Sequence, residues 1–222
     1  MIHPQTAASA APQKPLLRGR LHQIGFFVAI PAGGILVILA RGATARVGAL
    51  VYALSLMAVF ASSGAYHRLK GSPRALKRMR KLDHSMIYVL IAGTYTPFSL
   101  IALRGGWRIG MMTAAWAGAT VGIVLKLVKI DGLRAVAGTM YIALGWAIVP
   151  AMPQLIRELQ PAAIGLLATG GVLYTVGAIM FFRKRPDPSP RVFGYHEIWH
   201  SMTLGASVCH YTAVLMLVRA AR

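Results

Sequence analysis

The stretch HEIWHSMTLGASVCHYTAVLMLV, residues 196–218, joins two patterns that point to different kinds of protein. It begins with H-E-x-x-H, which on a helix marks a zinc-dependent peptidase. It continues as an apolar run of about the length that a helix needs to cross a bilayer. The fold class and the meaning of the two histidines therefore have to be decided from the rest of the chain.

The composition is that of a membrane protein. Of 222 residues, 56% are hydrophobic and 13% are charged, whereas soluble domains have about 45–50% and about 25%. The apolar residues gather in seven segments, 24–40, 47–66, 84–103, 107–125, 135–156, 161–182 and 196–218. These segments are too long and too uniformly apolar for the alternating strands of an outer-membrane barrel. We therefore predict an all-α bundle of seven transmembrane helices, with a polar basic tail at 1–20 and one domain at 21–222.

The first apolar segment has a second interpretation as a cleaved secretion signal. The residues "ATA" at 43–45 resemble the small-residue site at which such signals are cut. The polar tail before the segment is long, however, and Arg41 separates the apolar core from that site. We therefore expect a retained first helix.

The net charge of +19 is distributed unevenly between the two sides of the predicted membrane domain. Of the 24 Lys and Arg residues, 17 fall on the side of the N-terminal tail: Lys14, Arg18, Arg20, Arg68, Lys70, Arg74, Lys77, Arg78, Arg80, Lys81, Lys126, Lys129, Arg134, Arg183, Lys184, Arg185 and Arg191. Seven fall on the other side: Arg41, Arg46, Arg104, Arg108, Arg157, Arg219 and Arg222. Because positive loops stay in the cytoplasm, the N-terminus is predicted inside and the C-terminus outside, in a bacterial inner membrane. Anionic lipids account for the charge, and no nucleic-acid partner is needed.

The two histidines of the H-E-x-x-H pattern are spaced for a shared metal ion. His196 and His200 lie about 40° apart around a helix and one turn apart along it, so both can reach one Zn²⁺. Two interfacial histidines at a helix end are the alternative. His210 is about 15 Å further along the same helix than His200 and cannot bind the same ion. It is expected to form an interhelical hydrogen bond instead, and His22 is expected to lie at the membrane interface.

Further polar residues converge on the same side of the membrane. His67 ends the second predicted helix and Asp83 starts the third, and both fall on the side where His196 and His200 lie. A site with three histidines and a nearby carboxylate follows, although Asp83 alone could equally cap the third helix. Cys209 is the single cysteine, which leaves neither an internal disulfide nor a cysteine-based zinc site.

Three blocks of the sequence resemble the hemolysin III family of membrane proteins, which belongs with the adiponectin and progestin receptors in one superfamily. The blocks are SSGAYH at 62–67, KLDHSMIYVLIAGTYTPF at 81–98 and HEIWHSMTLGASVCHY at 196–211. The resemblance implies a seven-helix bundle with zinc near the cytoplasmic side. It also implies His67, His196 and His200 as ligands, Asp83 acting on the metal through a water, and Ser63 close by.

The resemblance changes the interpretation of Glu197. The pattern of the family is H-x-x-x-H, so the second position is not reserved for a catalytic glutamate. Glu197 also points about 100° away from His196 around the helix, and an ion pair with the basic loops is expected for it. Asp83 is therefore the preferred general base, with Ser63 to orient water or to stabilise a developing oxyanion.

The expected function follows from these residues and from the resemblance. Three neutral histidines leave a fourth metal position open, as in catalytic zinc sites. A hydrolase acting on a lipid amide or ester from the inner leaflet is the leading hypothesis, and the receptor branch of the superfamily implies ceramidase-like chemistry. The alternative is a sensor, transporter or receptor-like protein in which zinc only joins the second, third and seventh helices. Pore formation, which the family name suggests, is not favoured by any pattern in the chain.

Overall fold

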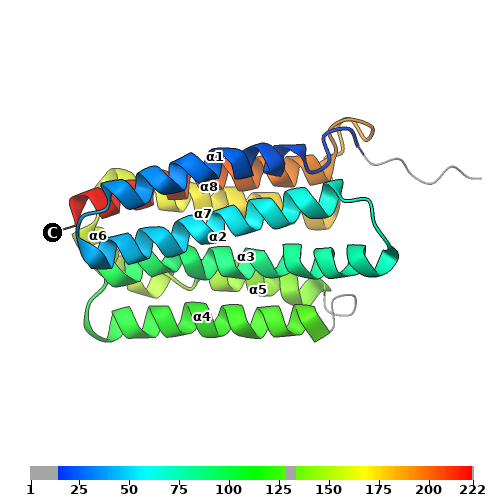
Figure 1. Ribbon diagram of the computed structural model, residues 1–222. Coiled ribbons are helices and arrows are strands. Elements are labelled where there is room, and N and C mark those ends of the chain that lie inside the picture. Colours follow the sequence, from blue (N-terminus) through cyan, green and yellow to red (C-terminus); the bar gives the residue numbers. More distant parts are fainter. Residues whose placement is uncertain (1–14, 129–133, 222) are drawn as a thin grey trace, which may run out of the picture.

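The computed structural model describes residues 15–128 and 134–221, and the regular elements in these ranges are helices (Figure 1). They are α1 (Arg20–Leu39), α2 (Gly42–Arg68), α3 (Pro73–Ile101), α4 (Gly105–Val128), α5 (Arg134–Trp146), the 3₁₀ turn η1 (Val149–Ala151), α6 (Met152–Glu158), α7 (Pro161–Arg183) and α8 (Tyr195–Ala220). Ser189 and Phe193 form an isolated β-bridge. The predicted all-α class is confirmed for this part of the chain. Lys14, Lys129, Asp131 and Arg222 lie outside the described residues.

Six segments of the described chain are long and apolar enough to cross a membrane. They are Arg20–Leu39, Gly42–Arg68, Gly105–Val128, Gly138–Glu158, Pro161–Arg183 and Tyr195–Ala220. The protein is therefore a multi-pass membrane protein. α3 is not among the six, because its charge-free part, 84–101, still contains polar residues such as His84, Thr94 and Thr96 that keep it less apolar than the six.

The start of α3 differs from the sequence prediction. The apolar segments 47–66 and 84–103 place the basic stretch 68–81 in a loop between two helices, but the helix already begins at Pro73. Ser72 is the N-cap, and its hydroxyl oxygen accepts a hydrogen bond from the Ala75 N–H at 3.3 Å. Proline at the first helical position is favourable because its missing N–H has no intrahelical partner there. Asp83 consequently lies inside α3 and is buried, so the alternative of a helix cap is wrong.

The fifth predicted span is interrupted. α5 ends at Trp146 and the chain continues through η1 into α6, because Pro150 and Pro153 lack the N–H that a continuous helix requires. The Tyr95 hydroxyl of α3 donates to the carbonyl of Leu144 at 2.7 Å. The Leu144 carbonyl also accepts the Ala147 N–H at 3.3 Å, and the Tyr95 hydroxyl lies 3.2 Å from the Gly145 carbonyl, so backbone carbonyls at the break keep hydrogen-bond partners within the apolar region.

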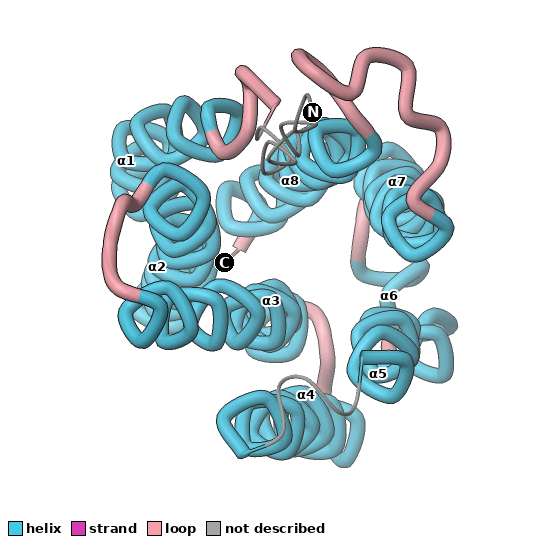
Figure 2. Tube along the Cα trace, turned by 90° about the vertical axis from the view of Figure 1, so that its right-hand side faces the viewer, coloured by secondary structure: helices cyan, strands magenta, loops and turns pink. Residues whose placement is uncertain are grey.

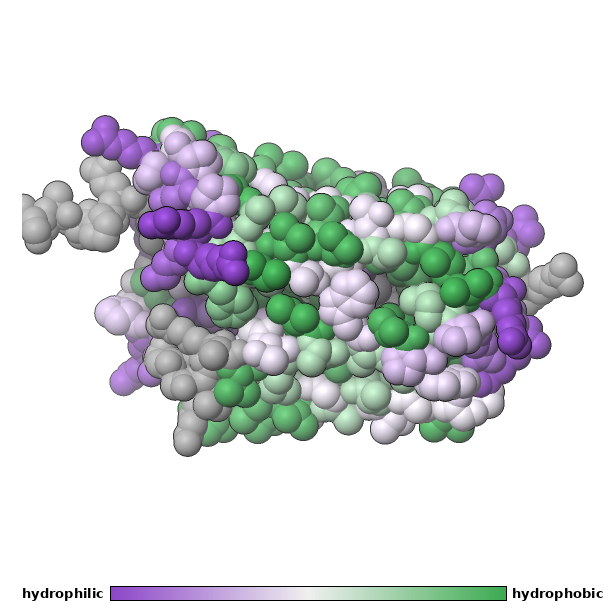
Figure 3. All heavy atoms as spheres, turned by 180° about the vertical axis from the view of Figure 1, so that it is seen from behind, coloured by the Kyte–Doolittle hydropathy of each residue, from purple (hydrophilic) through white to green (hydrophobic). Residues whose placement is uncertain are grey.

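Viewed end-on, α1, α2, α3, α4, α5, α7 and α8 follow one another around a ring (Figure 2). α8 also packs against α2 and α3, so it reaches the interior of the bundle. α2 and α3 approach closely where Gly48 faces Pro97, since a Cβ at Gly48 would lie 2.9 Å from the Pro97 Cα. The space-filling view shows a predominantly hydrophobic surface between hydrophilic ends, as a bilayer-spanning protein requires (Figure 3).

His67, His196 and His200 lie at the same end of the bundle. There α1, α3 and α8 begin and α2, α4 and α7 end, and we call it the histidine end (Figure 1). The segment before α1 packs on it, because the Leu16 N–H donates to the Arg191 carbonyl at 3.0 Å and the Leu17 N–H donates to the Val192 carbonyl at 3.3 Å. Residues 16–19 thus form a short segment, which we call the strap, that packs against the residues preceding α8.

Candidate metal centre

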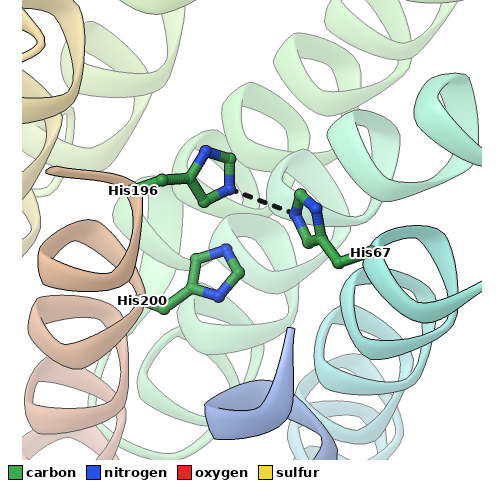
Figure 4. Close-up of side chains that lie close together, drawn as sticks. All are labelled: His67, His196 and His200. Atoms are coloured by element: carbon green, nitrogen blue, oxygen red, sulfur yellow. Dashed lines mark hydrogen bonds between the residues drawn. The ribbon is translucent and has the colours of Figure 1, made fainter. Parts of the chain in front are cut away.

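Three histidines meet at the histidine end, as the sequence predicted. His67 lies in the last turn of α2, and His196 and His200 lie in the first two turns of α8. One ring nitrogen from each lies within 4.8 Å of the others, and the Nε2 atoms of His67 and His196 are 3.1 Å apart. Figure 4 shows the three rings turned toward a common space.

This geometry fits a metal ion. Two nitrogens bound at about 2.0–2.1 Å with a tetrahedral angle are separated by about 3.4 Å, close to the His67–His196 distance. Histidine nitrogens are ligands that zinc readily accepts, and a set of three leaves room for a further ligand. The cluster could therefore hold a metal ion.

His22 supports the cluster from α1, a contact that the expectation of a residue at the membrane interface did not include. Its side chain is buried, and its ring lies parallel to that of His200, with centroids 3.8 Å apart and 7° between the planes. The Phe60 ring of α2 is tilted against His22, with centroids 5.1 Å apart and 57° between the planes. The position of His200 is therefore supported by the His22 ring stacked on it, which is itself in contact with Phe60 of α2.

Ser63 and Asp83 lie beside the histidines. Ser63 is one turn before His67 in α2, its side chain is hydrogen bonded to that of Asp83 in α3, and both are buried. Both also line the cavity that the three histidines line. Asp83 is not part of the set of close ligand atoms found among the described residues.

The cavity has a volume of about 650 Å³ and runs inside the ring of helices. From the histidines it extends past apolar side chains of α3, α5 and α7 to His210 in the middle of α8. His210 forms the expected interhelical hydrogen bond, with its Nε2 3.3 Å from the Leu167 carbonyl of α7. A volume of this size is in the range of sites that enclose small ligands.

Glu197 is engaged in structural contacts. Its carboxylate is fully buried, and one oxygen accepts the Gly194 N–H at 2.9 Å at the start of α8. The other oxygen accepts from Arg18 Nε at 2.5 Å. The expected ion pair is present, but its partner belongs to the strap before α1 rather than to a basic loop. Glu197 thus anchors the strap and the first turn of α8.

Sequence reasoning missed Arg18 and His22 as neighbours of the site. Both side chains line the cavity, although they lie more than 170 positions before the α8 residues that they contact. The only local sign was an Arg and a His placed where the polar tail meets the first apolar segment, which is also where ordinary interfacial residues occur.

Comparison with known proteins agrees with this architecture. The sequence profile described as Haemolysin-III related matches residues 10–211. The chain belongs to the hemolysin III family. It is 39% identical to Hemolysin-3 of Bacillus cereus over 89% of this chain and 88% of the relative. It is 34% identical to the Hemolysin-3 homolog of Bacillus subtilis (strain 168) over 87% and 89%. No solved structure matches it.

The region shared with the hemolysin III family contains the whole candidate centre. All five residues at issue, Ser63, His67, Asp83, His196 and His200, fall within the matched range. So does Arg18 of the strap, which pairs with Glu197. The candidate centre therefore lies within the range that the family profile matches.

Proposed function

We propose that the protein is a zinc-dependent hydrolase that cleaves a lipid amide or ester at the cytoplasmic face of a bacterial inner membrane. The observation that carries the proposal is the placement of the histidine cluster at one end of a largely apolar cavity. Ser63 and Asp83 line the same end of that cavity. A lipid chain in the apolar part would bring its polar linkage to the histidines.

The membrane orientation is part of the proposal. α3 is taken as the seventh span, since it packs between α2 and α4 along the bundle (Figures 1 and 2). The basic residues of the strap, the first turns of α3 and the α7–α8 connection lie at the histidine end, which favours the cytoplasm for that end. The N-terminus is then inside and the C-terminus outside.

The roles of the residues follow from their chemistry. His67, His196 and His200 would hold the ion, and zinc when bound supplies a Lewis acid that polarises a carbonyl and lowers the pKa of water toward 7. The Asp83 carboxylate accepts the proton of the attacking water, with its position fixed by the Ser63 hydroxyl. The water oxygen bonds to the acyl carbon, the C–N or C–O bond breaks, and the proton passes from Asp83 to the leaving amine or alcohol. The products are a free fatty acid and an amine or alcohol.

Purified zinc-loaded protein incubated with a panel of lipid amides and esters tests the proposal. We expect release of fatty acid from at least one lipid of the panel, loss of release after chelation of the metal, and recovery when zinc is added back. No zinc-dependent release from any lipid, with the metal stoichiometrically present, would contradict it.

A non-catalytic role has one observation in its favour. The cluster draws its ligands from α2 and α8, so a bound ion would join two helices even without chemistry. In that case zinc would raise thermal stability, no lipid would be cleaved, and Asp83→Asn would leave zinc binding unchanged. Zinc-dependent turnover that is lost in Asp83→Asn protein separates the hydrolase from this alternative.

A further inference from the structure

The histidine end of the cavity is lined by basic side chains that the proposed hydrolysis does not use. Arg18 comes from the strap, Arg80 from α3, Lys126 from α4 and Lys184 from the end of α7. Among the described residues that line the cavity, Asp83 is the acidic one. Four separate segments therefore place positive charge at the end of the cavity where the histidines lie, and we call this end the mouth of the cavity.

Lys126 is the most informative of these residues. It lies in the last turn of α4, is only 6% exposed, and belongs to a candidate membrane span. Its ammonium group lies 5.8 Å from the centre of the Tyr141 ring, a distance at which a cation and an aromatic ring attract one another. Buried cations in membrane helices are costly and commonly mark functional sites.

The Tyr141 ring that Lys126 contacts is itself held at the histidine end of the bundle. The Tyr141 hydroxyl of α5 donates to the His84 carbonyl of α3 at 2.9 Å, next to Asp83 in the chain. Arg80 lies three residues before Asp83 on α3, so the two side chains share a helix face. Lys126 and Arg80 are thus both held on the side of the cavity where the candidate metal centre lies.

The rest of the cavity is suited to a hydrocarbon chain. Its wall away from the mouth is formed largely by apolar side chains, including Val59, Leu90 and Ile142, and it reaches His210. His210 lies ten residues beyond His200 on α8, which corresponds to about 15 Å along the helix axis. The cavity therefore has a basic mouth and an apolar interior.

We propose that the cavity takes a single-chain lipid with an anionic phosphate headgroup, held at the mouth by Arg80, Lys126 and Lys184. Charge complementarity carries the choice, because a phosphate monoester offers three strong acceptor oxygens and about two negative charges to these cations. The chain fills the apolar interior, and the linkage between headgroup and chain lies beside the histidines. This inference rests on the proposed function, for which it names the substrate class.

Binding is tested with lipids that cannot be hydrolysed. The probes are a hexadecyl-ether glycerol phosphate and its zwitterionic phosphocholine counterpart, added to the purified protein in micelles of a neutral detergent. A ligand that binds the folded state raises the midpoint of thermal unfolding. We expect the phosphate lipid to act at a concentration about tenfold lower than the phosphocholine lipid. Inorganic phosphate alone should leave the midpoint unchanged.

Variants that each remove one positive charge test whether the cations of the cavity bind the phosphate lipid. In Lys126→Gln and Arg80→Gln proteins, the phosphate lipid should need about a tenfold higher concentration. Arg78→Gln is the matched control, because Arg78 is exposed on the same helix and does not line the cavity. Equal responses to the two lipids, or an unchanged response in both cavity variants, would overturn the proposal. If a variant does not fold, the comparison of the two lipids on the unmodified protein still decides the matter.

Failure of this inference is distinguishable from failure of the proposed function. Preferred binding of the phosphate lipid without turnover of any ester or amide would retain the binding site and remove the hydrolase. Zinc-dependent turnover that prefers zwitterionic or neutral lipids would retain the hydrolase and remove the phosphate site.

Discussion

Arg18 Nε lies 2.5 Å from Glu197 Oε1, so an ion pair joins the strap before α1 to the first turn of α8. The second carboxylate oxygen of Glu197 is used by the Gly194 N–H. One carboxylate oxygen therefore binds the strap, and the other binds the backbone at the start of α8. The H-E-x-x-H pattern keeps its two histidines in the candidate centre, while its glutamate has a structural role.

Glu197→Ala should destabilise the protein strongly without abolishing metal binding. The substitution removes a buried carboxylate that caps α8 and leaves Arg18 without its partner. Loss of one member of a buried ion pair costs about 3–5 kcal/mol. The free energy of unfolding, measured in a titration of mixed micelles with SDS, checks the loss, and elemental analysis checks the metal.

The ion pair between Arg104 and Glu158 provides the matched control. It lies at the opposite end of the bundle, its atoms are 3.4 Å apart, and its side chains are 71% and 34% exposed. Glu158→Ala should therefore change the unfolding free energy by no more than about 1 kcal/mol. A loss at Glu197 no larger than that at Glu158 would contradict the structural role.

His22→Ala should weaken zinc binding by about tenfold or more, as loss of a residue that supports a metal ligand commonly does. The substitution removes the ring that lies parallel to His200 and gives the ligand freedom to move. His22→Phe preserves a flat ring and should retain most of the affinity. Competition with a fluorescent chelator measures both, and equal affinities for the wild type and His22→Ala would show that the stack does not position His200.

The ligand cluster could be predicted from the sequence because its information is local. The spacing of His196 and His200 follows from helix geometry, and the succession of apolar segments places His67 and Asp83 on the same side. The start of α3 also had a local signal, since Ser72 followed by Pro73 is typical of a helix N-terminus. The same residues with Gly71 are also typical of a loop, and the loop is the interpretation adopted from the sequence.

The support of the cluster could not be predicted in this way. The contacts of Arg18 with Glu197 and of His22 with His200 join residues that are 179 and 178 positions apart. Such contacts depend on α1 lying beside α8, and no periodicity within either segment specifies that neighbour. The position of Lys126 at the mouth of the cavity could not be predicted either, because it depends on how α4 packs against α5.

Gly19→Ala should destabilise the histidine end. Gly19 has φ +78°, and a Cβ there would lie 2.5 Å from the Cβ of His67. The left-handed backbone alone costs about 1–2 kcal/mol for an alanine, and the contact adds to that cost by moving a metal ligand. Thermal unfolding and zinc affinity should both decrease. Gly34→Ala in α1, where a Cβ meets nothing within 4 Å, should be neutral or slightly stabilising.

Removal of a ligand should remove the metal and the stability that it provides. His67→Ala, His196→Ala and His200→Ala proteins should each contain much less than one zinc ion per chain by elemental analysis. Chelation should lower the unfolding midpoint of the wild type, because an ion would join α2 to α8. His210→Gln is the control, since His210 lies outside the cluster. Full zinc content in all three alanine variants would make the assignment of the centre wrong.

Asp83→Asn should abolish turnover and leave zinc bound. The amide is similar in size to the carboxylate and can still interact with the Ser63 hydroxyl, but it cannot accept the proton of water. Loss of a general base typically lowers the rate by about 10²–10⁴-fold. Ser63→Ala should have a smaller effect, because it removes only the group that positions Asp83. The measurement is fatty-acid release per zinc ion, so that any loss of metal is accounted for. Turnover in Asp83→Asn equal to that of the wild type would exclude Asp83 as the base, and the buried carboxylate would then have only a structural role between α2 and α3.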